Sequence, residues 1–432
     1  MDPLSLRAHP QEVFRLQPMP DLPEFDCTIP VKSLPAQPSV YEPAVFRLDP
    51  SQEVDMPHAP MQVDKIDEEH EIKYAMDISE AGMMGKYMSH KRSLDEIIPH
   101  LPAIPPHVKD FLQTRFKPCN FCPTPYLKDV SPLATIPPPR FLDQKNAHPW
   151  DQRIVFVDEP HKYFIDGCCA YILSATTFIS AFLPKFDGPA QAVSTFSGKT
   201  FRDTVHRPSH KYHGCTSPED IQERWTYWAN LGTWLHANIE SYFNHEPFEV
   251  HPENVEPYRQ FKELFSDEDW VDWEPFRTEW SIFDPETLIA GQIDFLGMIN
   301  PQNGHVVIVD WKRCESIGDC CFNRFRGLPP SVGYGVCSGL ENSKWVKYSL
   351  QLNLYKYILE KNYGLYVKKM YLVQCHPKLQ KKGAAVYKVG NLQRVIEEMM
   401  ACRKLALKQC IEEDQNAALA AERQQHQQQQ QQ

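Results

Sequence analysis

The sequence predicts an α/β fold preceded by a long proline-rich extension. From residue 151 onward, segments with strand-like and helical patterns follow one another as two strands, a helix start, a long helix, three strands, a helix, a strand and a final helix. Before that point proline dominates: 24 of the 38 prolines lie in the first 150 residues, where they disfavour helix interiors and central strands. With 42% hydrophobic residues, the 432-residue chain can build a substantial core.

Composition divides the chain into three parts. We expect residues 1–150 to form a mostly disordered extension, residues 151–411 a globular domain, and residues 412–432 a glutamine-rich disordered tail. The extension contains a repeated hexamer, VFRLQP from Val13 and VFRLDP from Val45. Two copies of an apolar-basic hexamer are a candidate docking site for a protein partner, and chance similarity in a biased sequence is the alternative.

Bulk properties exclude several classes of protein. No run of 18 apolar residues is present, so we expect no membrane span, and the N-terminus lacks the pattern of a secretory signal. Thirteen scattered cysteines, an odd number, favour a reduced intracellular chain over a disulfide framework. The net charge of −11 gives no bulk attraction to nucleic acid, so such a partner would need a local basic surface or bound metal ions.

Local signals place the elements of the globular domain. The long helix begins at Ser217, a good N-cap residue, with Asp220 in its first turn. Turn-forming residues and glycine separate the predicted elements on either side of this helix from one another. We expect strands within 153–167, a strand and a helix start within 170–183, the long helix over 217–244, strands near 277–283, 289–299 and 305–312, a helix over 345–364, a strand over 367–377 and a last helix over 391–410.

The segment IAGQIDFLGMINPQNGHVVIVDWKR, from residue 289, predicts a hairpin that carries charged groups within a core-like pattern. If the strands pair about a turn centred near Gln302, Asp294 faces Asp310, and Lys312 lies on the same face as Asp310. Two opposed carboxylates on half-buried strands destabilise a sheet unless a cation neutralises them, and carboxylate oxygens suit Mg²⁺ or Mn²⁺. A lysine beside them can orient or deprotonate an attacking water. The alternative is a hairpin edge with solvated charges.

Other polar residues in neighbouring elements extend this set. His236 and Glu240 lie one turn apart on the long helix, as do Gln351 and Tyr355 on the later helix, and Glu279 lies within a strand-like run. Each has an ordinary explanation when taken alone: a satisfied core histidine, an amphipathic helix surface, or an exposed strand edge.

Taken in order, the segments GTWLHANIE, TEW, GQID, DWK and QLNLY resemble the motifs of the RecB-like branch of the PD-(D/E)xK nuclease superfamily. The wording of the last two is most similar to nuclease genes of large eukaryotic DNA viruses and some eukaryotes. The resemblance spans about residues 151–410 and implies a restriction-endonuclease-like fold, a mixed central sheet flanked by helices. Some RecB-like relatives carry four cysteines that hold an iron–sulfur cluster. This chain departs from them, because Cys402 and Cys410 lack the close Cys-x-x-Cys spacing of that set. Cys119 and Cys122 offer only half of a zinc site.

The resemblance also implies roles for individual residues. Asp294 and Asp310 would bind the metal, with the main-chain carbonyl of Trp311 as a third ligand and His236 as an added one. Glu279 would support the metal site, and Lys312 would be the catalytic lysine. Gln351 and Tyr355 would position the DNA backbone, and Glu240 would orient its neighbours. Independently of the resemblance, Arg313 belongs to a basic cluster that, beside a metal site, is a candidate for tracking phosphates.

We therefore expect a Mg²⁺- or Mn²⁺-dependent deoxyribonuclease, an exonuclease acting in DNA replication, recombination or repair on single- or double-stranded DNA without sequence preference. A structure-specific endonuclease or junction resolvase, and an inactive nuclease-fold scaffold that binds DNA, are the alternatives. No nucleotide cofactor is expected. We expect an intracellular location, at the nucleus or the site of DNA replication, with the cytoplasm as the alternative.

Overall fold

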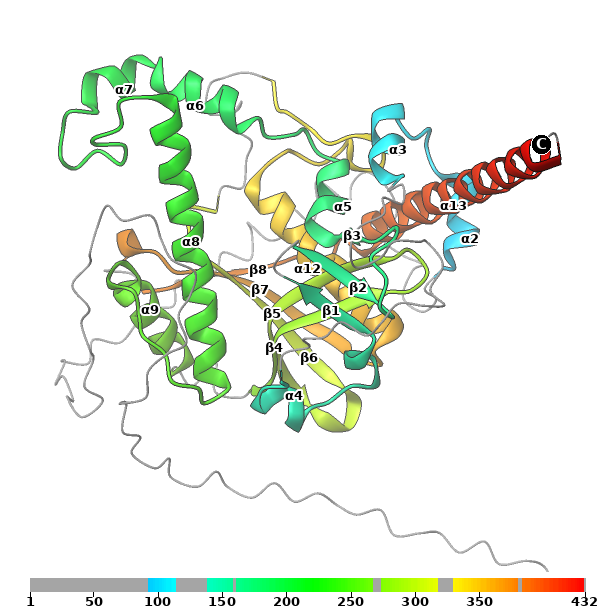
Figure 1. Ribbon diagram of the computed structural model, residues 1–432. Coiled ribbons are helices and arrows are strands. Elements are labelled where there is room, and N and C mark those ends of the chain that lie inside the picture. The colour runs from blue at the N-terminus through cyan, green and yellow to red at the C-terminus, as the bar shows by residue number, and fades with distance from the viewer. Residues whose placement is uncertain are drawn as a thin grey trace, which may run out of the picture. The chain divides into compact units, whose positions relative to one another are not determined.

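The computed structural model describes residues 92–113, 138–157, 161–266, 273–317, 329–379 and 383–430 (Figure 1). The VFRLQP and VFRLDP repeats and the pair Cys119 and Cys122 lie outside these residues. Two sheets are present in the described part. A small antiparallel pair, β1 (Ile154–Val157) and β2 (Lys162–Ile165), accompanies a six-stranded mixed sheet with helices on both faces. The predicted fold class, a mixed sheet flanked by helices, is confirmed.

The mixed sheet is built around β5 (Ile289–Asn300), which pairs antiparallel with both β4 (Glu274–Asp284) and β6 (His305–Lys312). The short β3 (Leu173–Ser174) runs parallel to the start of β5. On the far side of β6, β7 (Tyr366–Gln374) is parallel and β8 (Ala385–Lys388) is antiparallel to β7. The parallel step from β6 to β7 is connected through a helix, as parallel neighbours require.

Two layers of helices cover the sheet because its side chains alternate between faces. Val306 and Ile308 of β6 join a core with α5 (Ala175–Ala181), α12 (Lys344–Asn362) and α13 (Gln393–Gln430). Val307 and Val309, on the opposite face, join a core with α8 (Pro218–Phe243) and α9 (Val255–Phe265). After residue 161, the other helices are α6 (Gly188–Phe196) and α7 (Lys199–Thr204), with short 3₁₀ turns at Pro252–Asn254, Pro301–Asn303, Gly335–Cys337 and Pro377–Leu379.

The predicted elements of the hairpin and of the long helix are confirmed. Ser217 caps α8 with its side chain, and Asp220 completes a capping box, so two backbone N–H groups at the helix start are satisfied. In the hairpin, Phe295 pairs with Val309 and Leu296 with Ile308. When this register is continued by one residue, Asp294 lies opposite Asp310. A 3₁₀ turn forms the connection, and Gly304 ends it at φ 60°, a left-handed conformation that suits glycine.

The structure corrects both predicted limits of the globular domain. Residues expected in the disordered extension form α2 (Leu94–Ile97), 3₁₀ turns at Ile98–His100 and Pro149–Gln152, α3 (Pro106–Leu112) and α4 (Phe141–Lys145). Apolar side chains of these helices, Leu94 and Val108 among them, are buried in the main core. Prolines lie at helix starts there, where they are tolerated.

At the other end, the tail expected to be disordered continues α13 as far as Gln430. Alanine, glutamate and glutamine favour helix, and they extend a helix already nucleated by its packed first half. Within the described residues, no helix has the length and apolar character needed to cross a membrane.

Candidate active site

The candidate site lies where the sheet forks. Along one edge of β5, β4 pairs from Ile289 to Met298. On the other edge, β3 pairs with Ile289 and Ala290, and β6 pairs from Phe295 onward. Residues 291–294 therefore have no strand partner on that second edge in the described sheet, and this gap between β3 and β6 is called the fork. Asp294 lies at the fork, and its Oδ2 accepts a hydrogen bond from the backbone N–H of Trp311 at 2.9 Å, in place of a strand carbonyl.

Helix α8 brings His236 to the fork. Its buried residues Leu235 and Ile239 pack against the sheet and set the rotation of the helix. His236 Nε2 lies 2.9 Å from the carbonyl oxygen of Trp311, and since a carbonyl only accepts, the ring nitrogen donates. The other nitrogen, Nδ1, lies 3.5 Å from an oxygen of Glu279 and 3.5 Å from an oxygen of Asp294.

Glu279 reaches this cluster through an unusual backbone conformation. Thr278 pairs with Phe295 and Trp280 with Ile293, so Glu279 lies level with Asp294 on the neighbouring strand. With the hairpin register, three carboxylates stand in one row across three strands, those of Glu279, Asp294 and Asp310. Glu279 has φ 43°, in the left-handed region that costs a non-glycine residue about 1 kcal/mol or more. Gln292 Nε2 donates to the Glu279 carbonyl at 2.9 Å and holds the turned peptide.

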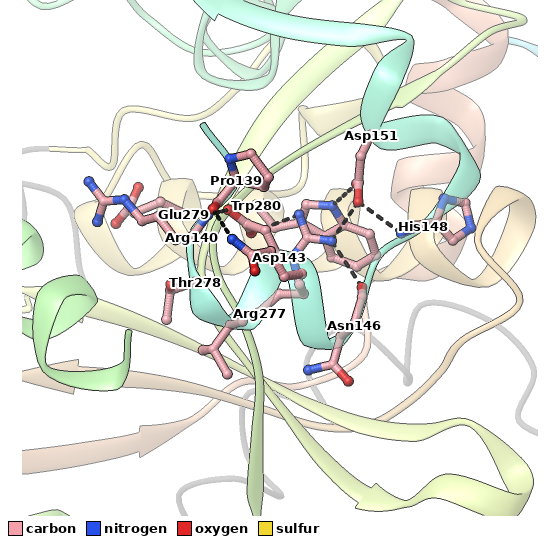
Figure 2. Close-up of polar contacts among 12 residues, drawn as sticks. Pro139, Arg140, Asp143, Asn146, His148, Asp151, Arg277, Thr278, Glu279 and Trp280 are labelled. Atoms are coloured by element: carbon pink, nitrogen blue, oxygen red, sulfur yellow. Dashed lines mark hydrogen bonds and ion pairs between the residues drawn. The ribbon is translucent and has the colours of Figure 1, made fainter. Parts of the chain in front are cut away.

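A buried network anchors β4 on either side of Glu279 (Figure 2). The guanidinium of Arg277, only 4% exposed, lies 3.0 Å from Asp143 and 2.8 Å from Asp151, and it also donates to the Asn146 carbonyl. Trp280 Nε1 donates to the other oxygen of Asp151 at 2.8 Å. Segment 138–152, placed by composition in the extension, therefore holds the strand that carries Glu279.

The same segment also reaches Glu240. Arg140, which precedes α4, lies 2.8 Å from the Glu240 carboxylate and 3.5 Å from Glu246. Glu240 thus faces Arg140, one turn along α8 from His236. Burial, partly opposed by Arg140, raises the pKa of Glu240 to about 7. Glu240 joins the segment 138–152 to the helix that carries His236, and the orienting role expected for it stays a prediction.

Asp310 and Lys312 form a buried ion pair at the end of β6. Asp310 is 1% exposed, and its Oδ1 has no hydrogen-bond donor among the described residues. The ammonium of Lys312 also lies 4.8 Å from the centre of the Tyr348 ring on α12. Burial lowers the pKa of Lys312, but the carboxylates of Asp310 and Asp294 outweigh burial and raise it, so the lysine stays protonated in the metal-free protein.

Burial and neighbouring charges shift the pKa values of the other groups at the fork. Burial and then the charge of Asp294 raise the pKa of Asp310 to about 7, against the effect of Lys312. Burial also raises the pKa of Asp294, although His236 and Lys312 oppose the shift. For His236, burial lowers the pKa, but Asp294 and Glu279 outweigh burial and raise it to about 9. The protonated His236 and Lys312 therefore supply the positive charge that faces the carboxylates at the fork.

The donor set fits a divalent cation. One ligand atom each from His236, Glu279 and Asp294 lies within 4.8 Å of the others. Oxygens on opposite sides of Mg²⁺ are about 4.2 Å apart, twice the metal–oxygen distance of about 2.1 Å, so small shifts suffice. Asp310 lies outside this group of atoms and contacts Lys312, and the Trp311 carbonyl is hydrogen-bonded to His236. Their roles as ligands stay predictions.

Metal affinity should depend on pH through His236. A raised pKa means that the protonated ring stabilises the metal-free fold below about pH 6.5, and that this contribution is lost as pH rises through about 9. A ligand ring must first lose that proton, so we expect the Kd for Mn²⁺ to fall about tenfold per unit between pH 7 and 8.5. Titration calorimetry in buffers of different ionisation enthalpy measures both the Kd and the released proton. A His236→Asn variant should lack the slope, and a flat wild-type profile would contradict the assignment.

The remaining predicted residues divide into two groups. Gln351 and Tyr355 lie over the fork from α12, with Gln351 Nε2 donating to the Tyr355 hydroxyl at 3.0 Å. A Cβ at Gly291 would lie 2.5 Å from the Tyr355 ring, so only glycine admits the tyrosine there. Arg313 instead donates to Asn254 Oδ1 at 2.6 Å and to the Glu253 carbonyl, so its guanidinium ties the end of β6 to the turn before α9.

Sequence patterns missed Arg277, Gln292 and Tyr348. Gln292 lies inside the GQID segment, two residues before Asp294, and the strand period of two, which places both side chains on one face, was the available signal. Arg277 and Tyr348 carried none, because their partners come from distant segments.

Comparisons with known proteins assign no family to this chain. No family model matches the chain, and no curated protein matches it. Among solved structures, it is similar to a candidate exonuclease from Eubacterium rectale, at 14% identity over 52% of this chain and 83% of that one, with a TM-score of 0.28. It is also similar to the protein SSO0001, at 13% identity over 54% of this chain and 75% of that one, with a TM-score of 0.22. Likenesses this distant carry no argument about function, which rests on the site.

Proposed function

We propose that the protein is a divalent-metal-dependent nuclease that hydrolyses phosphodiester bonds of DNA. The observation that carries the proposal is the meeting, at one fork in the sheet, of the His236, Glu279 and Asp294 ligand atoms with the buried Asp310–Lys312 pair. Three carboxylates beside two cations leave negative charge that a metal ion would neutralise. A satisfied structural cluster would not leave a buried carboxylate oxygen of Asp310 without a donor.

The residues divide the work by their chemistry. His236, Glu279 and Asp294 would hold Mg²⁺ or Mn²⁺, with Asp310 beside them. The bound ion supplies Lewis-acid stabilisation of the phosphodiester and lowers the pKa of water. Lys312, protonated in the metal-free protein, would serve as a hydrogen-bond donor to the phosphate or to the attacking water. Gln351 and Tyr355 present an amide and a hydroxyl from α12 toward the same fork.

The finer proposal is an exonuclease of DNA replication, recombination or repair, the activity that the motif order implies. An inactive scaffold would not need Glu279 held in a left-handed conformation beside His236. The complete set of ligand and cation groups thus favours an enzyme.

A substrate panel tests the proposal directly. The full chain, with Mg²⁺ or Mn²⁺, is incubated with end-labelled single- and double-stranded linear DNA, closed circular DNA and RNA. We expect linear DNA to shorten progressively while circles stay intact. Cutting of circles would instead assign a structure-specific endonuclease. If no substrate is cleaved under either metal, the enzyme assignment is wrong.

A further inference from the structure

A cleft of about 730 Å³ opens beside the fork. Its walls come from α3, β2 and the segment that leads through β3 into α5, which lie together in Figure 1. Six of its lining residues carry the argument: Asp110, Phe111, Lys162, Tyr163, Ser174 and Thr177. One wall therefore belongs to α3, a helix that composition placed outside the globular domain.

The cleft adjoins the candidate active site through α5 and Tyr163. Ser174 lines the cleft, and the next residue is Ala175. A Cβ added at Gly291 would lie 3.0 Å from the Ala175 side chain and 2.5 Å from the Tyr355 ring, so both residues pack beside Gly291. Tyr163 lies near enough to Glu279 that the carboxylate charge adds to burial in raising the pKa of the Tyr163 hydroxyl. Two residues of the cleft wall, Ser174 and Tyr163, thus connect the cleft to the fork, where the proposed metal ligands lie.

The chemistry of the walls suits an aromatic, anionic ligand. Phe111 is a large apolar side chain left 45% exposed, and Tyr163 adds a second ring. Ser174 and Thr177 supply hydroxyls and Lys162 a cation, with Asp110 as the one acid among the six residues named above. Aromatic rings that stack on bases, together with cations that meet phosphates, are the usual means of holding single strands without sequence preference.

A buried cation behind the cleft adds to this character. Arg403 of α13 is fully buried, and its guanidinium donates to the carbonyls of Thr287, Leu112 and Tyr171. No carboxylate forms an ion pair with it in the described part of the chain. Burial lowers its pKa to about 10, so it is charged at neutral pH. Because Leu112 adjoins the cleft wall and Tyr171 is part of it, this charge favours an anion in the cleft.

We infer that this cleft binds the unpaired terminal nucleotides of the strand being cleaved, a ligand class that rests on the proposed function. A site of this volume holds a ligand of small-molecule size, on the scale of one or two nucleotides, and cannot enclose a duplex. Helix α3 is then part of the nucleic-acid site.

Binding without metal tests this inference separately from cleavage. The Kd of a labelled single-stranded oligonucleotide is measured in chelator by fluorescence anisotropy for the full chain and for a Phe111→Ala, Lys162→Ala variant. Loss of one stacking ring and one cation should weaken single-strand binding about tenfold. A blunt duplex of equal length should lose less than about twofold, since it has no unpaired end. An oligonucleotide carrying 5-iodouracil at its terminus should cross-link to peptides that contain Phe111 or Tyr163.

A matched control is available on the connection between α5 and α6. Phe186 is 62% exposed and follows the exposed Lys185, so Lys185→Ala with Phe186→Ala removes the same chemistry outside the cleft. Binding should change less than twofold in this variant. Equal losses in both variants, equal losses for single strand and duplex, or cross-links confined to other elements would overturn the inference. The substrate panel, run on the unaltered chain with metal, decides the proposed function independently.

Discussion

Replacing Asp310 by asparagine should lower kcat for DNA cleavage by about a thousandfold or more, while the fold remains intact. The substitution keeps the shape of a side chain that is 1% exposed and removes one of three carboxylates that face only two cations. Because the pKa of Asp310 is already raised to about 7, its charge opposes folding in the metal-free protein at higher pH. We therefore expect the metal-free variant to have a Tm no lower than the wild type, and a smaller rise in Tm on adding Mg²⁺.

The control for Asp310 is an aspartate in an ordinary ion pair. Asp166 pairs with Arg153 at 2.8 Å on an exposed part of the surface, so Asp166→Asn should leave both kcat and Tm nearly unchanged. Single-turnover cleavage and thermal unfolding, each with and without metal, measure the two quantities. Cleavage by Asp310→Asn within about tenfold of wild type would show that the carboxylate is not needed for the reaction.

Replacing Lys312 by methionine should separate catalysis from metal binding. Methionine keeps an apolar stem of similar length but removes the ammonium that lies between Asp310 and the Tyr348 ring. We expect kcat to fall at least a hundredfold, because the group proposed to donate to the phosphate or the attacking water is lost. The Kd for Mn²⁺ should stay the same or fall, because a nearby positive charge that repels the ion has gone. Rapid-quench kinetics and calorimetry on the same preparation measure both.

Lys361 offers a matched lysine away from the fork. It pairs with the fully buried Asp284 at 2.9 Å and with Glu286. Lys361→Met should destabilise the fold, because it leaves a buried carboxylate without its cation, but should not change kcat below the unfolding temperature. Lys312→Arg, which keeps a charge, should retain more activity than Lys312→Met. A parallel loss of metal affinity and kcat in Lys312→Met would contradict the assigned role.

The parts of the fold that local rules govern could be predicted from the sequence. The hairpin register follows from a turn-rich NPQNG segment centred near Gln302 between two apolar runs, so the alignment of Asp294 with Asp310 was predictable. The start of α8 follows from Ser217 and Asp220, and the helix period then places His236 and Glu240 on one face. These features depend on residues within a few positions of one another.

The parts that depend on distant partners could not be predicted. Arg277 is buried by contacts with Asp143 and Asp151, more than 120 positions away, and a strand arginine ordinarily indicates an exposed edge. Proline-rich composition concealed α2, α3 and α4, whose stability comes from burying a few apolar side chains in a core built by later residues. Neither the paired residues nor the shared core can be read from a local window.

The left-handed backbone at Glu279 bears on which substitutions selection would accept. For folding alone, glycine or asparagine is the better residue at φ 43°, and either would also relieve the crowding of carboxylates. A Glu279→Gly or Glu279→Asn change would therefore be expected to stabilise the metal-free fold while removing one of the proposed metal ligands. A related sequence with glycine or asparagine aligned to Glu279, but with the DWK segment intact, should be expected to fold well and cleave nothing. The residue at position 279 would then distinguish related sequences that cleave DNA from those that do not.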